Sequence, residues 1–70
     1  MPNYYVNKNA QSTGEHEVHE ESCSKLPHYE NRIHLGYFFK CEDAVKKAKE
    51  IIKNAEVDGC KICSSACHKK

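Results

Sequence analysis

The residues best suited to chemistry in this 70-residue sequence are its five cysteines and five histidines. Cys60 and Cys63 form a Cys-x2-Cys knuckle directly after Gly59. Two thiolates three residues apart can point from one tight turn at a common Zn²⁺, and a glycine relieves the backbone just before them. His19 and Cys23 provide a second pair in a His-x3-Cys spacing. The two pairs together predict a closed Cys3His zinc site of the structural type.

The C-terminal Cys67 and His68 leave the identity of the fourth ligand open. The knuckle and either of these residues could supply three ligands from one segment, with Cys23 as the fourth. We favour His19, because a metal that joins it to the tail closes a long loop of the chain. Cys67 is then a spare thiol near the metal or the fourth ligand in place of His19. The candidate ligands are His19, Cys23, Cys60, Cys63 and Cys67.

Other interpretations of the cysteines lead to different chemistry. A Cys-x2-Cys pair can carry thioredoxin-like redox activity, but no βαβ pattern precedes Cys60. The cysteines could also form disulfides that hold the domain together. Cys41 stands at the start of an expected helix and is interpreted as a buried or N-capping residue. A closed zinc site has no open position for a substrate, so we expect no enzymatic activity.

Length and composition exclude several classes of protein. Eleven basic and ten acidic residues give a formal net charge of +1, which excludes a strongly basic nucleic-acid binder. No apolar run approaches the ~20 residues of a membrane span, and the N-terminus does not resemble a secretory signal. We therefore expect a cytoplasmic protein. An apolar core of this size yields only ~3–5 kcal/mol, so a metal or disulfide is expected to add stability.

The sequence predicts three strands. Residues 4–7 and 15–19 have aromatic or alternating apolar character and are separated by a polar stretch, which indicates a hairpin. Residues 33–39 give the strongest strand signal, with a glycine inside it that indicates a bulge or a close backbone approach. The polar segment 20–32 between them is predicted to be the loop that carries Cys23.

The clearest predicted element is an amphipathic helix at about 42–55. Its apolar residues recur at helical spacing: Ala44, Val45, Ala48, Ile51, Ile52 and Ala55. Residues 57–59 are interpreted as a turn, followed by a cysteine-rich tail. The predicted fold is therefore α+β, with a small three-stranded antiparallel sheet packed on one amphipathic helix and stapled by zinc. Residues 1–70 form one domain.

Several motifs resemble those of known proteins: Tyr4-Tyr5-Val6-Asn7, His16-Glu17-Val18-His19-x3-Cys23, Leu35-Gly36-Tyr37-Phe38 and Gly59-Cys60-x2-Cys63-x3-Cys67-His68. Along most of its length the chain resembles a family of short uncharacterised bacterial proteins that has no assigned activity. Residues 19–63 are more distantly similar to the zinc-binding domain of Ada-type DNA-methylation-response proteins. That resemblance implies zinc ligands at positions 19, 23, 60 and 63. Ada-type domains carry a methyl-accepting cysteine where this chain has His19, so methyl transfer is not implied.

These observations favour a small cytoplasmic zinc-binding module that contacts a protein or nucleic-acid partner. Lysines in the C-terminal half could face phosphates. Four of them, however, fall on the solvent side of the predicted helix among acidic residues, where charged residues are ordinary. The alternative is a thiol redox or metal-handling protein that uses the C-terminal cysteine cluster. We expect no membrane association and a monomer.

Overall fold

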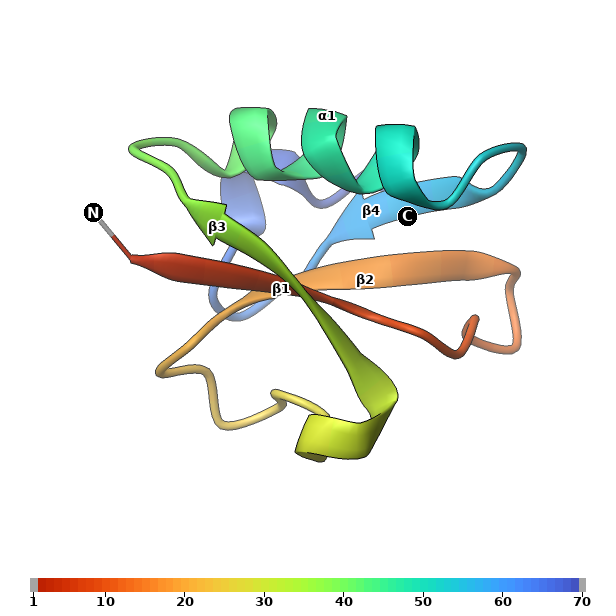
Figure 1. Ribbon diagram of the computed structural model, residues 1–70, viewed down its shortest axis with the longest axis horizontal. Helices are drawn as coiled ribbons and strands as arrows, with labels where there is room; N and C mark the ends of the chain where they lie inside the picture. The colour runs from red at the N-terminus through yellow and green to blue at the C-terminus, as the bar shows by residue number, and fades with distance from the viewer. Residues whose placement is uncertain (1, 70) are drawn as a thin grey trace.

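One helix lies across one face of a four-stranded sheet (Figure 1). The structure is a computed structural model and describes residues 2–69. Its elements are β1 (Asn3–Asn7), β2 (Glu15–Glu20), a short 3-10 turn η1 (Tyr29–Asn31), β3 (Arg32–Tyr37), α1 (Cys41–Ile51), β4 (Glu56–Gly59) and a second 3-10 turn η2 (Ser65–Cys67).

The sheet is mixed, so the predicted three-stranded antiparallel sheet is wrong. The strand order is β3-β1-β2-β4, with β1 antiparallel to both of its neighbours and β4 parallel to β2. Residues 57–59, predicted as a turn, instead belong to β4, which contains a single large apolar residue, Val57. Its extended form depends on pairing with the distant β2, where Val18 lies opposite Gly59. The α+β class and the single amphipathic helix are confirmed.

Apolar side chains alternate with other residues along β1 and β2, and those on the face toward α1 form the apolar core. Tyr4 and Val6 of β1 and Val18 of β2 are buried with Ala44 and Ala48 of the helix. Among the described residues, the largest side chains less than 2% exposed are the two valines. An apolar core this small leaves the fold in need of a further source of stability.

The helix is shorter at its C-terminal end than the predicted 42–55. It ends at Ile51, and the Ile52 N–H still donates to the Ala48 carbonyl at 2.8 Å. Asn54 then adopts a left-handed conformation with φ of 64°. This conformation is tolerated by asparagine better than by most residues, and here it lies in the turn that leads into β4.

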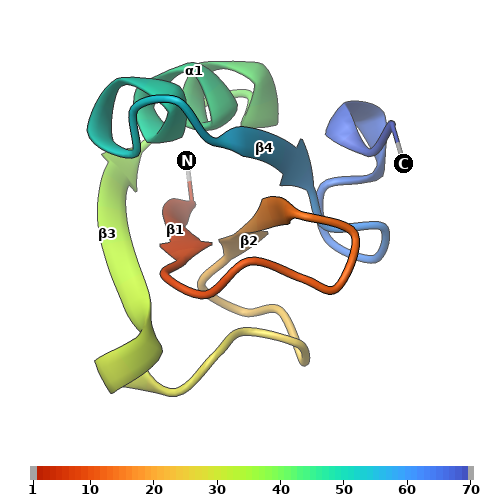
Figure 2. The ribbon, with the colours of Figure 1, turned by 90° about the vertical axis from the view of Figure 1, so that its right-hand side faces the viewer.

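The segment between β2 and β3 lies on the opposite side of the sheet from α1, as Figures 1 and 2 both show. Two successive turns shape its first part. The Cys23 N–H donates to the Glu20 carbonyl, and the Leu26 N–H donates to the Cys23 carbonyl, each at 3.1 Å. These turns hold Cys23 close to the end of β2.

Candidate metal centre

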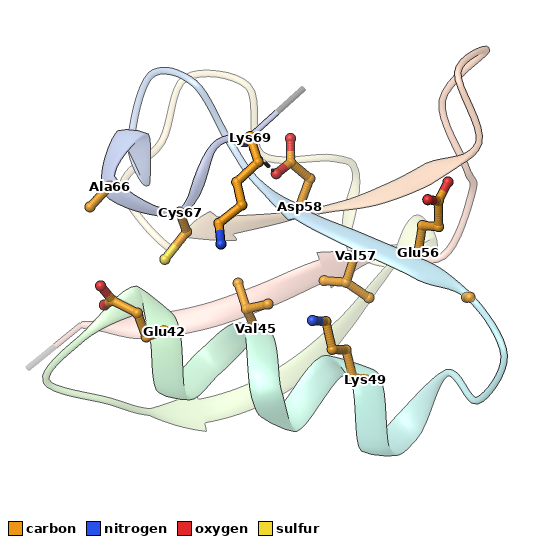
Figure 3. Close-up of a pocket in the computed structure, with 10 residues that line it drawn as sticks. Glu42, Val45, Lys49, Glu56, Val57, Asp58, Ala66, Cys67 and Lys69 are labelled. Carbon is orange, nitrogen blue, oxygen red and sulfur yellow. Dashed lines mark hydrogen bonds between the residues drawn. The ribbon is translucent and has the colours of Figure 1, made fainter.

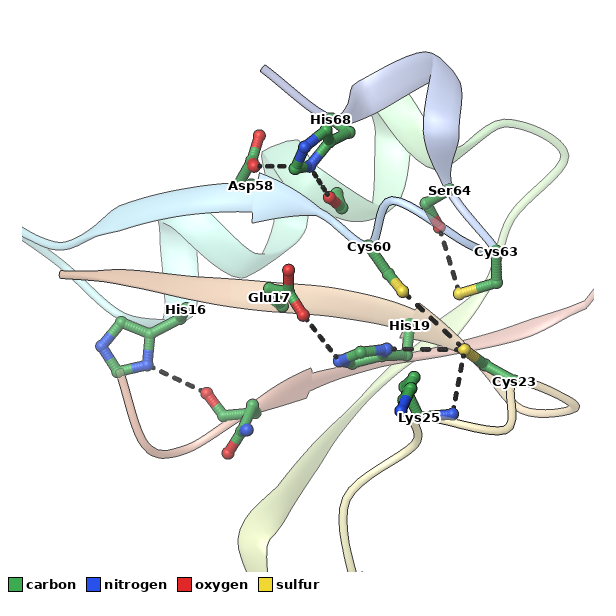
Figure 4. A network of polar contacts seen from close by, with 12 residues as sticks. His16, Glu17, His19, Cys23, Lys25, Asp58, Cys60, Cys63, Ser64 and His68 are labelled. Atoms are coloured by element: carbon green, nitrogen blue, oxygen red, sulfur yellow. Dashed lines mark hydrogen bonds and ion pairs between the residues drawn. The ribbon is translucent and has the colours of Figure 1, made fainter. Parts of the chain in front are cut away.

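Four side chains from three segments meet at the C-terminal end of β2 (Figure 4). His19 comes from β2, Cys23 from the loop that follows, and Cys60 and Cys63 from the turn after β4. One ligand atom from each residue lies within 4.8 Å of the other three. The parallel pairing brings them together, because the Cys60 N–H donates to the Val18 carbonyl at 2.9 Å.

The separations within this cluster fit a tetrahedral metal ion. The Cys23 Sγ lies 3.8 Å from the Cys60 Sγ and 3.7 Å from the His19 Nδ1. A tetrahedron with metal–sulfur distances of about 2.3 Å has ligand–ligand edges of about 3.8 Å. The two separations from Cys23 match this edge length, and all four ligand atoms lie within 4.8 Å of one another.

The Glu17 carboxylate faces the imidazole of His19. Its Oε1 lies 3.5 Å from the His19 Nε2, on the far side of the ring from Cys23. A metal-ligating histidine commonly donates its second ring N–H to a carboxylate, which fixes the tautomer. Burial lowers the pKa of His19, and the smaller effect of Glu17 opposes this shift. The neutral imidazole that a metal requires is therefore the favoured form.

Backbone N–H groups face two of the sulfur atoms. The Glu20 N–H donates to the Cys63 Sγ at 3.2 Å, and the Lys25 N–H donates to the Cys23 Sγ at 3.4 Å. Donors in these positions favour the thiolate form. Burial nevertheless raises the pKa of the Cys63 thiol to about 12. A bound cation would offset this cost of desolvation, because metal ligation deprotonates a thiol outright.

Three thiols and an imidazole can hold a metal ion, and their chemistry favours transition metals over Mg²⁺ or Ca²⁺, which prefer oxygen. A cavity of about 390 Å³ adjoins the cluster and is lined by both His19 and Cys60, together with Lys25, Lys61 and Ile62. The cavity thus borders two of the four candidate ligands, both of which are buried.

The fifth candidate ligand, Cys67, is not part of this cluster. It forms a disulfide with Cys41, with a Cα–Cα distance of 6.3 Å. His68 also points elsewhere, since its Nδ1 lies 3.1 Å from both the Asp58 Oδ2 and the Gly59 carbonyl oxygen. The structure thus divides the five cysteines into three free thiols and one disulfide.

Sequence analysis missed two residues that bear on the chemistry. Cys41 was interpreted as buried or N-capping. It is buried, but it is the first helical residue rather than the cap, and its pairing went unnoticed. The 26-residue separation from Cys67 provides no local signal. Glu17 could have been found, because residues two apart on a strand share a face and it precedes His19 by two.

Comparison with known proteins gives no relative: no protein-family model, curated protein or solved structure matches the chain. Within residues 2–69, no helix is long and apolar enough to span a membrane.

Proposed function

We propose that this protein is a small zinc-binding module whose metal ion is structural and whose surface contacts a protein or nucleic-acid partner in the cytoplasm. The observation that carries the proposal is the cluster of His19, Cys23, Cys60 and Cys63, with one ligand atom from each within 4.8 Å of the rest. Cys3His is a common ligand set of structural zinc sites. The layout similar to Ada-type zinc-binding domains supports the same four ligands.

A metal at this position would stabilise the chain as a whole. It would join β2, which carries Val18 of the apolar core, to the loop after β2 and the turn after β4, neither of which adds a large apolar side chain to that core. Metal-binding free energy becomes folding free energy when the ligands come together only in the folded state. Four protein ligands would also close the site, which favours a structural role over catalysis.

The exposed tip of the knuckle is the part of the centre best placed to meet a partner. Ile62 is 62% exposed, and Lys61 beside it is also exposed. An apolar and a basic side chain on a turn fixed by metal can contact either a protein or a phosphate backbone. Chemical shifts of residues 61 and 62 should move in an NMR titration with a random oligonucleotide if the partner is nucleic acid, and this binding should weaken steeply as salt is raised. No shift at low salt would exclude nucleic acid and leave a protein partner.

The experiment that tests the metal proposal is native mass spectrometry of protein produced with zinc, combined with circular dichroism after chelation. We expect one zinc per chain in the native spectrum and loss of secondary structure when a chelator removes it. His19→Gln should abolish zinc retention, whereas His16→Gln, on the same strand but outside the cluster, should not. A folded chain that binds no zinc would contradict the proposal.

One further observation favours a second candidate function, which is thiol redox chemistry. The Cys41–Cys67 disulfide is separate from the three thiols of the metal centre. A protein with this division could bind metal through one set of cysteines and exchange electrons through the other.

A further inference from the structure

We propose that the groove between α1 and the C-terminal tail binds a small thiol that carries carboxylates, and that this thiol exchanges with the disulfide at Cys67. The inference deepens the second candidate function above. It rests on the Cys41–Cys67 disulfide and not on the metal centre, which uses different cysteines.

The groove is large enough for a molecule of this kind. Its volume is about 530 Å³, and it lies between α1 on one side and β4 with the tail on the other (Figure 3). Pockets for small ligands usually measure roughly 300–1,000 Å³. Val45 of the helix and Val57 of β4 supply apolar contact surface within it.

Charged side chains in the groove match the charges of a small amino-acid-derived thiol. The ammonium groups of Lys49 and Lys69 are turned toward the same space from opposite sides (Figure 3). Glu42 lies at the disulfide, with its carboxylate and the two sulfur atoms within 4.8 Å of one another. Glu56 and Asp58 of β4 also belong to the lining, but Figure 3 shows their carboxylates turned away from α1. The two ammonium groups therefore suit carboxylates of a ligand, and the Glu42 carboxylate suits its ammonium group.

One of the two sulfur atoms of the disulfide faces the groove, although Cys41 and Cys67 are each only 7% exposed. Cys67 lines the groove, and Figure 3 shows its Sγ turned into it. Cys41 is absent from the described residues that line the groove. Thiol–disulfide exchange requires access to the sulfur that is attacked, so Cys67 is the expected site of attack.

The first step is the attack of the deprotonated thiol on the Cys67 Sγ. The new bond joins the ligand sulfur to Cys67, the Cys41–Cys67 bond breaks, and Cys41 leaves as a thiolate that takes up the proton released by the incoming thiol. Its S–H can then donate to the Glu42 Oε1, which lies 3.7 Å from the Cys41 Sγ.

The second step uses another molecule of the same small thiol. It attacks the ligand sulfur of the mixed disulfide, and Cys67 leaves and is protonated. The net reaction converts two small thiols and one protein disulfide into one small disulfide and two protein thiols. Two electrons pass from the small thiols to the protein, and the reverse reaction reforms the Cys41–Cys67 bond at the expense of the small disulfide.

Mass spectrometry of the full chain with reduced glutathione tests this inference. The disulfide form is first prepared with oxidised glutathione and is identified by a mass lower by two hydrogens. Reduced glutathione should then add the mass of one whole glutathione, and peptide mapping should place it on Cys67. Adducts confined to Cys41, Cys23, Cys60 or Cys63 would overturn the inference, as would failure of Cys41 and Cys67 to pair.

Charge variants test whether the groove recognises the thiol. Lys49→Gln and Lys69→Gln should each slow formation of the Cys67 adduct by about two- to fivefold with glutathione, as expected for exposed ion pairs. The slowing should be smaller with 2-mercaptoethanol, which has no carboxylate for the two lysines to bind. Lys46→Gln is the matched control, because Lys46 is exposed on the same helix but does not line the groove. Equal glutathione rates for all three variants and the parent chain would overturn recognition by the groove.

The same experiment separates this inference from the metal proposal. Each sample is analysed by native mass spectrometry with and without zinc. A chain that holds zinc but forms no Cys67 adduct refutes the groove and leaves the metal centre standing. A chain that forms the adduct but holds no zinc refutes only the metal centre.

Discussion

At the scale of single residues, the candidate metal centre depends on which nitrogen of His19 faces the sulfur ligands. The Glu17 carboxylate faces the Nε2, and the Nδ1 lies 3.7 Å from the Cys23 Sγ. The strand places both side chains on one face of the sheet, and burial keeps the imidazole neutral. Glu17 would not bind the metal itself, but it would hold the His19 ring in the orientation that metal binding needs.

Removing the Glu17 carboxylate should therefore weaken zinc binding while leaving the ligands intact. We expect Glu17→Ala to lower zinc affinity by about 10–100-fold, the usual effect of losing a partner of a ligating histidine. Competition with a chromophoric chelator measures this change. Glu50→Ala, on the exposed surface of α1, should have no effect. Equal loss in both variants would show that net charge, rather than orientation of His19, is responsible.

The thiol of Cys63 makes metal binding depend on pH. Because burial raises its pKa to about 12, this thiol is protonated at neutral pH in the metal-free protein and must lose its proton when metal binds. Zinc affinity should therefore rise by about tenfold per pH unit for each proton released between about pH 6 and 8. Titrations corrected for the protonation of the competing chelator measure the slope. A slope of zero would contradict ligation by a buried thiol.

At the scale of elements, β4 and the tail fit together through the absence of a side chain at Gly59. A Cβ at this position would lie 2.5 Å from the Cys67 Cβ and 2.7 Å from the Ser64 carbonyl oxygen. Two of the nearest atoms belong to the backbone of the tail, which cannot move aside cheaply. The close approach places η2 directly against the strand that leads to the knuckle.

Gly59→Ala should accordingly destabilise the fold and loosen the knuckle. We expect the free energy of unfolding in urea to fall by about 1–3 kcal/mol, the usual cost of overpacking a tightly filled site. Ser65→Ala, at an exposed position of η2, is the control and should change it little. If the two variants are equally stable, the tail can move to accommodate a Cβ at residue 59, and the prediction is wrong.

The elements that the sequence predicted correctly are those with a strong local pattern. The alternation around Val18 and the helical spacing of Ala44 and Ala48 are local, and their elements formed near the expected positions. β4 was missed because Glu-Val-Asp-Gly has no pattern of its own and becomes a strand only through β2. The helix was predicted too long because its apolar stripe continues to Ala55, beyond the reversal at Asn54.

The candidate site was likewise predicted only where the signal in the sequence was local. Short spacings within the chain pointed to the two pairs that the structure brings together, but they could not distinguish Cys67 from a ligand. Its partner, Cys41, stands at the start of a helix 26 residues away. Only the packing of η2 against α1 shows that these two thiols meet.

At the scale of the whole molecule, the disulfide and the metal centre would stabilise overlapping parts of the chain. The disulfide links α1 to the tail and closes a loop that contains β4, Cys60 and Cys63. A cross-link lowers the conformational entropy of the unfolded chain, and this effect grows with the length of the closed loop. The small apolar core makes this contribution large in relative terms.

Reduction of the disulfide should therefore lower the stability of the metal-loaded protein. For a separation of 26 residues we expect a loss of about 3–4 kcal/mol, measured by urea unfolding with and without a phosphine reductant. The double variant Cys41→Ala/Cys67→Ala should show the lower stability from the outset and should not respond to the reductant. A response in that variant would place the sensitive cysteines in the metal centre instead.

The strand order also has a consequence for the order in which the chain can fold during synthesis. Residues 3–37 contain β1, β2 and β3 and can form an antiparallel sheet as soon as they leave the ribosome. On that nascent sheet, His19 and Cys23 would form an incomplete ligand set. The outer edge of β2 would stay unpaired until residues 56–63 emerge. Parallel pairing of β4 then covers the edge and delivers the other two thiols in a single event. Protection of the growing chain against edge-to-edge association and completion of the proposed ligand set would thus share one step.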